Sequence, residues 1–198
     1  MAKPKASEKL KAEYLILLTQ CRIGKSKAVG NRYPWQCQSA IRELTRFAAE
    51  RQGEWGGSES PTTIRILTGT LPNYVFGCTE TTKALAEFVE AGGRIRVIVW
   101  AKTLDTKNNL FSRFATTFDR SVEIRVSRTD HLGDRINHFF VVDDYAYRLE
   151  EPHTPTQPDK FDDFEPEIPA RIAFDDKSIG GTLVNFFDAI WESVTPTA

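Results

Sequence analysis

The pattern of apolar and polar positions divides the chain into an N-terminal helical part and a longer part in which strands and helices alternate. Residues 5–20 have helical periodicity, and a second helix is predicted from Pro34, which suits a helix start, to Gly53. The basic segment 21–34 between them contains two glycines and predicts a loop. The Gly- and Ser-rich segment 53–61 predicts a turn or linker before the second part begins.

After this linker the pattern changes to short apolar strands separated by helices. Strands are predicted at residues 62–70, 94–101, 121–127, 137–144, 145–150 and 170–174. Helices are predicted at 79–93, 106–118 and 175–194, with Thr79 and either Asp175 or Asp176 as N-caps. The last helix has an apolar face made of Leu183, Phe186, Phe187, Ile190 and Trp191. This order predicts an α/β sheet that is parallel at first and ends in an antiparallel hairpin, with a tight turn at Asp143 and Asp144.

The same pattern predicts the domain organisation. Residues 1–57 are expected to form an N-terminal helical extension, and residues 58–198 an α/β domain. A chain of 198 residues that is 40% hydrophobic can supply the core of such a domain. Residues 151–169 form an acidic, proline-rich loop of a length found in lids, partner contacts and tethers, and we expect a solvated insertion.

Charge and cysteine content exclude several classes of protein. A formal net charge of -1 gives no overall field that would draw the chain to nucleic acid or to an anionic membrane, so any such binding needs a local patch. The three cysteines are far apart and form no Cys-x-x-Cys pair, which indicates buried reduced thiols and neither disulfides nor a zinc site. The apolar run near the N-terminus is too short for a membrane span or signal sequence. We therefore predict a cytoplasmic protein without metal, cofactor or membrane partner.

A short basic motif at Gly24 to Ser26 is similar to the end of a phosphate-binding P-loop. The first glycine of that motif would stand five residues before Gly24, where this chain has Thr19, and no buried strand precedes it. A solvated basic loop is therefore expected here.

Three segments of the second part resemble one half of the phospholipase D superfamily. "KALAEFVEAGGRIRVIVW" is similar to the segment in which a helix ends on glycine and leads into a central strand. "HFFVVDD" is similar to the active-site strand, and "LVNFFDAIWESV" to the closing helix. The resemblance covers about residues 62–194. It implies a mixed sheet with the order strand, helix, strand, helix, three strands, helix, flanked by helices.

Active members of that superfamily carry His-x-Lys-x4-Asp, and two such motifs meet at one site. The resemblance implies that one histidine attacks phosphorus, the other protonates the leaving oxygen, and lysines hold the phosphate charge without a metal.

This chain can be laid on that motif in three registers. The histidine, lysine and aspartate positions are then His138, Phe140 and Tyr145; Asn137, Phe139 and Asp144; or Ile136, His138 and Asp143. No register gives more than one of the three residues. His138, Asp143 and Asp144 remain the candidate catalytic residues, but the motif is degenerate, and catalysis of the family type is not expected because phenylalanine supplies no cation.

The remaining candidates are residues that could bind a ligand. On a strand His138 shares a face with Phe140 and Val142, which suits either a half-buried core histidine or a retained pocket histidine. Arg148 and Glu150 lie two apart, so they share a face and are expected to form a structural ion pair or a ligand clamp.

A second group of basic residues lies before the motif strand. Arg125, Arg128 and Arg135 could contact phosphates beside the pocket, although Asp130 and Asp134 interrupt them, which is typical of a mixed solvated loop.

Three functions follow from these residues. The first is a noncatalytic phospholipase D-like protein, acting as a homodimer or complex subunit in bacterial nucleic-acid processing or phage defence. The second is a metal-independent phosphodiesterase or nuclease that uses His138 from two subunits. The third is a protein-interaction module with Trp35, Phe47 and Trp55 as its partner surface. The sequence does not distinguish DNA from RNA, and it does not place loop 151–169 relative to the pocket.

Overall fold

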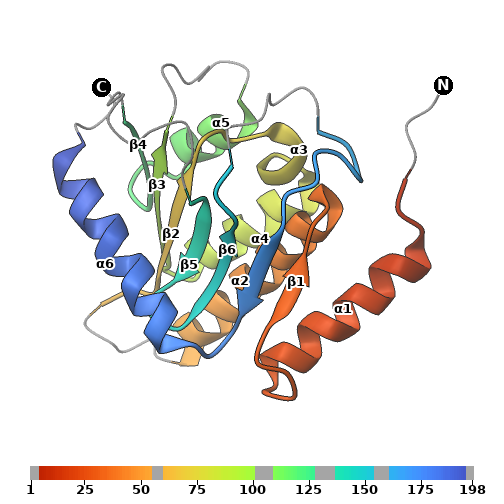
Figure 1. Ribbon diagram of the computed structural model, residues 1–198. Helices are drawn as coiled ribbons and strands as arrows, with labels where there is room; N and C mark the ends of the chain where they lie inside the picture. Colours follow the sequence, from red (N-terminus) through yellow and green to blue (C-terminus); the bar gives the residue numbers. More distant parts are fainter. Residues whose placement is uncertain (1–4, 55–59, 101–108, 128–136, 154–160, 195–198) are drawn as a thin grey trace.

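One mixed sheet with helices on both faces organises the chain (Figure 1). The computed structural model describes residues 5–54, 60–100, 109–127, 137–153 and 161–194. The strands are β1 (Val29–Asn31), β2 (Thr63–Thr68), β3 (Arg94–Val99), β4 (Val122–Val126), β5 (Phe139–Val142), β6 (Ala146–Glu150) and β7 (Ala170–Ala173). The helices are α1 (Glu8–Arg22), α2 (Pro34–Glu54), α3 (Asn73–Phe76), α4 (Thr79–Glu90), α5 (Leu110–Thr117) and α6 (Lys177–Ser193).

The sheet has a parallel and an antiparallel half. Its order is β1-β7-β6-β5-β2-β3-β4, in which β2, β3 and β4 are parallel and the remaining neighbours are antiparallel. Strand β5 joins the halves, because it pairs with β2 on one side and forms a hairpin with β6 on the other. The predicted α/β fold class is confirmed.

Alternating side chains of the sheet fill two hydrophobic layers. Phe140 and Val142 point into the larger layer beneath α2 and α4, which lie behind the sheet in Figure 1. Phe139 and Val141 point the other way and pack with Phe187 of α6. Side chains alternate between the two faces along β5, so every second residue faces α2. His138 lies two residues before Phe140 and therefore faces α2 as well.

Strand β1 corrects the prediction that residues 21–34 form only a loop. Val29 pairs with Ile172 and Asn31 with Ala170, which places β1 at the sheet edge beside β7. Three residues are too few to show an alternating pattern, so the pairing depends on a distant strand rather than on local sequence. The N-terminal residues thus contribute to the same sheet as the α/β part.

The helix caps agree with the prediction in one case and differ in another. Asp176 caps α6, since its side chain accepts a hydrogen bond from the backbone N–H of Ile179 at 3.3 Å. The prediction for Thr79 was wrong, because α4 begins at Thr79 and Cys78 is the N-cap residue, without a side-chain cap bond.

Two predictions about aromatic side chains were wrong. Phe186 is 45% exposed, because the buried stripe of α6 is narrow and runs through Leu183, Phe187 and Trp191. Trp35 was predicted to lie on a partner surface, but it is only 5% exposed and belongs to the core.

Phe47 does not fit the partner surface either. It is half-buried and packs edge-on against Tyr145 and Phe174, as core residues do. Trp55 lies outside the described residues.

Within the described part of the chain, no helix combines the length and the apolar character that crossing a membrane requires.

Candidate functional site

A pocket opens on the α2 side of the sheet, where β5 begins and β6 ends. Polar residues that line it include Arg32, His138, Arg148, Glu150 and His153. Phe161, Pro166 and Ile168 of the acidic loop also line it. Loop residues 161–169 therefore form a wall of the pocket.

Asp163 anchors this wall to other parts of the chain. Its carboxylate accepts hydrogen bonds from the backbone N–H of Ala6 at 2.6 Å and from the hydroxyl of Tyr74. The expectation of a simple solvated insertion is wrong for this part of the loop, because the segment is tied to the N-terminal residues and to α3.

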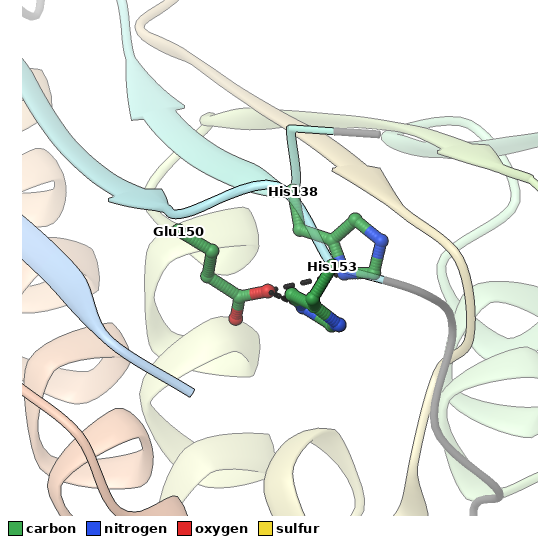
Figure 2. Close-up of side chains that lie close together, drawn as sticks. All are labelled: His138, Glu150 and His153. Atoms are coloured by element: carbon green, nitrogen blue, oxygen red, sulfur yellow. Dashed lines mark hydrogen bonds and ion pairs between the residues drawn. The ribbon is translucent and has the colours of Figure 1, made fainter. Parts of the chain in front are cut away.

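Strand pairing places His138 opposite Glu150. The pairs Phe139 with Leu149 and Phe140 with Arg148 extend to these two residues, and the backbone N–H of Glu150 donates to the carbonyl of His138 at 2.9 Å. His138 is two residues from Phe140, and Glu150 is two residues from Arg148, which pairs with Phe140. Their side chains therefore lie on the same side of the sheet as that of Phe140, the α2 side. His153, which follows β6, completes the group that Figure 2 shows.

Glu150 is the centre of a hydrogen-bonded cluster. Its Oε2 lies 3.1 Å from Nδ1 of His138 and 2.9 Å from Nε2 of His153, and both side chains point toward it in Figure 2. Its Oε1 accepts from a guanidinium nitrogen of Arg148. The Nε of Arg148 donates to Oδ1 of Asn31 at 3.0 Å, so β1 completes the polar network.

Arg148 decides the charge state of this cluster. Burial alone would raise the pKa of Glu150, but the charge of Arg148 and the hydrogen bonds from His138 and His153 hold this pKa well below its usual range. Arg148 itself is only 4% exposed. The cluster therefore contains a buried carboxylate and a buried guanidinium that compensate each other, which is the ion pair that their spacing predicted.

The two imidazoles differ in their exposure. His138 is 7% exposed, and its Nε2 is buried without a hydrogen-bond partner among the described residues. His153 is half-buried and closer to solvent. Their ring centroids are 4.3 Å apart, so a ligand in the pocket can meet both rings.

Sequence reasoning missed His153. A signal was present, because His153 follows Glu150 by three residues just past the end of a strand. The sequence does not show the register in which β5 and β6 pair at this end. The contact between His153 and His138 is therefore seen only in the structure.

Asp143 and Asp144 do not join this cluster. They lie in the turn between β5 and β6, at the opposite end of β5 from His138. Asp143 has a φ of 43° and accepts a hydrogen bond from the backbone N–H of Thr63 at 2.8 Å, and Asp144 is exposed. The geometry gives Asp143 a structural part in the turn.

Arg125 also lies elsewhere. It is on β4, at the sheet edge opposite to β1, and its Nη1 donates to the carbonyls of Trp191 at 2.7 Å and of Val194 at 3.2 Å. Its guanidinium lies 4.0 Å from the centroid of the Trp191 ring. Arg128 and Arg135 lie outside the described residues.

The two phenylalanines that two of the three predicted registers place at the lysine position are buried. Phe139 packs in the layer beneath α6 and Phe140 in the layer beneath α2, each 2% exposed. In the third register the lysine position is His138, and the histidine position, Ile136, lies outside the described residues.

Comparison with solved structures identifies the fold. No family model matches the chain, and no curated protein matches its sequence. Solved structures do match it, at low sequence identity. A phospholipase D family member, Nuc from Salmonella typhimurium, has a TM-score of 0.54 and 10% identity, over 86% of this chain and 98% of that chain.

Two further solved structures share the fold. TrmBL2, an archaeal chromatin protein whose structure shows a novel mode of DNA binding, has a TM-score of 0.53 and 12% identity, over 96% of this chain. The match spans 62% of TrmBL2, less than two thirds of its length. Polyphosphate kinase from Porphyromonas gingivalis has a TM-score of 0.58 and 14% identity, over 94% of this chain and 29% of that chain. These likenesses show a phospholipase D-like fold.

Proposed function

We propose that this chain is a phospholipase D-like protein that binds nucleic acid at the pocket of His138 and His153 without cleaving it, as a homodimer or as a subunit of a larger complex. The observation that carries this proposal is the cluster around Glu150. In it one histidine of the motif strand is bound to a carboxylate whose charge a buried arginine compensates.

We expect no cleavage because the pocket does not direct enough positive charge at a phosphate. Hydrolysis of the family type needs positive charge directed at the phosphoryl oxygens in the transition state, which is usually the largest catalytic contribution. In two of the three registers the lysine position is Phe140 or Phe139, and both side chains are buried in the hydrophobic layers. Arg148 is cationic, but its charge is already paired with Glu150.

Binding of a phosphate backbone has weaker requirements than catalysis, since it needs position and charge alone. The side chain of Arg32 is 59% exposed and lines the pocket, where its partner is Glu167 at 3.5 Å. His153 lines the same pocket, so its ring can contact a ligand bound there. The DNA-binding archaeal neighbour makes nucleic acid the best-supported ligand class. A role in bacterial nucleic-acid processing or phage defence extends this by analogy.

The test is fluorescence anisotropy with labelled single- and double-stranded DNA and RNA in EDTA, with the same samples run on a gel to detect cleavage. We expect binding without cleavage, and weaker binding by Arg32→Ala and His153→Ala. Arg46→Ala is the matched control, because the side chain of Arg46 is 55% exposed but does not line the pocket. Equal loss in the Arg46 variant would indicate unspecific charge attraction, and no binding by the parent would refute the proposal. Light scattering of the same samples tests for a dimer.

One observation favours a second candidate function, a metal-independent phosphodiesterase. The rings of His138 and His153 are close together and share the carboxylate of Glu150, so one chain supplies two imidazoles to one pocket. Cleavage in EDTA that both His138→Ala and His153→Ala abolish would support it. Cleavage that only His138→Ala abolishes would instead support a site completed by a second subunit.

A further inference from the structure

We infer that His138, Glu150 and His153 form a binding site for one divalent transition-metal ion, with Zn²⁺ the preferred ion. Each residue offers one ligand atom, and these three atoms lie within 4.8 Å of one another. Two imidazole nitrogens and one carboxylate oxygen are a set that zinc sites with an open fourth position use. The inference goes beyond nucleic-acid binding and does not depend on it.

The separations within the cluster are close to those that a metal requires. Nδ1 of His138 and Nε2 of His153 lie 3.1 Å and 2.9 Å from Oε2 of Glu150. Two ligand atoms that are each about 2.0–2.2 Å from a tetrahedral Zn²⁺ are about 3.3–3.5 Å apart. An outward shift of a few tenths of an ångström, by small side-chain rotations, therefore makes room for the ion. The two ring N–H protons that form these hydrogen bonds are lost from the ligating nitrogens as the ion binds, to the other ring nitrogen or to solvent.

The backbone holds the ligands in place before any ion arrives. His138 and Glu150 face each other across a backbone hydrogen bond of 2.9 Å, and His153 pairs with the same carboxylate just after β6 ends. Figure 2 shows the three side chains pointing toward one another from these positions. Binding thus orders few new torsions, which favours affinity.

Arg148 supports the site and also limits its strength. It holds Oε1 of Glu150, which leaves Oε2 directed at both imidazoles, as outer partners of metal-binding carboxylates do. Its positive charge opposes a second cation nearby, so we expect weaker binding than by the same ligands without an arginine. Two imidazoles also select against Mg²⁺ and Ca²⁺, which prefer oxygen ligands.

All three ligand residues line the pocket, so the fourth coordination position is left to water or to a small pocket ligand.

The test uses the full chain, stripped with a chelator and dialysed, then titrated with Zn²⁺ by calorimetry and with Co²⁺ by visible absorption. We expect one ion per chain, a tetrahedral or five-coordinate Co²⁺ spectrum, and no measurable Mg²⁺ binding. His153→Ala is the main variant because His153 is only half-buried. It should weaken binding by at least the roughly 10–100-fold that loss of an outer partner causes.

His131→Ala is the matched control, since His131 is the remaining histidine of the sequence. Glu150→Gln is the second variant, and thermal melts establish that each variant is folded. The inference is overturned by a folded parent that binds no Zn²⁺, by unchanged binding in folded His153→Ala, or by loss of binding in His131→Ala. Because nucleic-acid binding is measured in EDTA, failure of either proposal is seen separately from the other.

Discussion

Nδ1 of His138 lies 3.1 Å from Oε2 of Glu150, and the backbone N–H of Glu150 donates to the carbonyl of His138 at 2.9 Å. Main chain and side chains thus hold this pair together. Strand register therefore sets the geometry of this pair. A slip of one residue between β5 and β6 would turn one side chain of the pair toward α6 and abolish the cluster.

Replacing Arg148 by alanine should strongly destabilise the protein. The change leaves the buried carboxylate of Glu150 without its cation, and breaking such a pair costs about 3–5 kcal/mol. Urea unfolding at neutral pH measures the loss. The double variant Arg148→Met with Glu150→Leu should recover much of it, because neither member of the pair then leaves an unpaired buried charge. A loss of less than about 1 kcal/mol for Arg148→Ala would contradict the buried ion pair.

Two neighbouring glycines of α6 should respond in opposite directions to alanine. A Cβ on Gly180 would lie 2.3 Å from the backbone carbonyl oxygen of Asp144, whereas nothing lies within 4 Å of a Cβ on Gly181. We expect Gly180→Ala to cost about 1–3 kcal/mol through displacement of α6, and Gly181→Ala to add about 0.5–1 kcal/mol through helix propensity. Thermal melts of the two variants compare their stabilities directly. Equal changes in melting temperature would contradict the close contact between α6 and the β5–β6 turn.

Asp143 should make the protein less stable as pH rises. Burial raises its pKa above the ordinary value, against the opposing effects of the Thr63 hydrogen bond and the charge of Arg65. The folded state therefore binds this proton more tightly. Its stabilising contribution is complete below the unfolded-state pKa and is lost as pH rises through the folded-state pKa.

Asp143→Asn tests this prediction. Asparagine keeps an acceptor for the N–H of Thr63 and tolerates the φ of 43°. Urea midpoints across acidic and neutral pH should show a weaker pH dependence and no loss of stability at pH 7. A loss above about 1 kcal/mol at pH 7 would mean that the ionised carboxylate is needed in the turn.

Arg125→Ala should reduce stability and leave nucleic-acid affinity unchanged. Its guanidinium stacks on Trp191 and donates to two carbonyls at the end of α6, contacts worth about 1–3 kcal/mol together. Unfolding and anisotropy on the same preparation separate the two effects. Weaker nucleic-acid binding at full stability would assign Arg125 to a binding surface after all.

Cys37 should resist alkylation until the protein unfolds. Burial raises the pKa of its thiol to about 12, so its thiolate fraction at pH 8 is about 10⁻⁴. Cys78 is half-buried and should react first with iodoacetamide, as mass spectrometry of the modified peptides would show. Early labelling of Cys37 in native protein would indicate that the pocket wall opens.

Local periodicity predicted most of the fold because its strands and helices carry their own signals. The apolar runs of β5 and β6 and their short turn predicted the hairpin, and the two-residue spacing of Arg148 and Glu150 predicted their ion pair. β1 was missed because it pairs with β7, a strand distant in sequence, and such pairing leaves no mark on the short segment itself. The meeting of His138 with His153 was missed because it depends on the register of the β5–β6 hairpin, which the apolar runs of the two strands do not fix.

The edge position of β1 also bears on how the chain folds as it is synthesised. Among the described strands β1 pairs only with β7, and Asn31 at its end supports Arg148 from 117 residues away. During synthesis β1 therefore cannot pair until β7 has emerged from the ribosome. The pocket is completed only after residues 161–168, which form one of its walls, have emerged, and contacts of such sequence separation make folding slow.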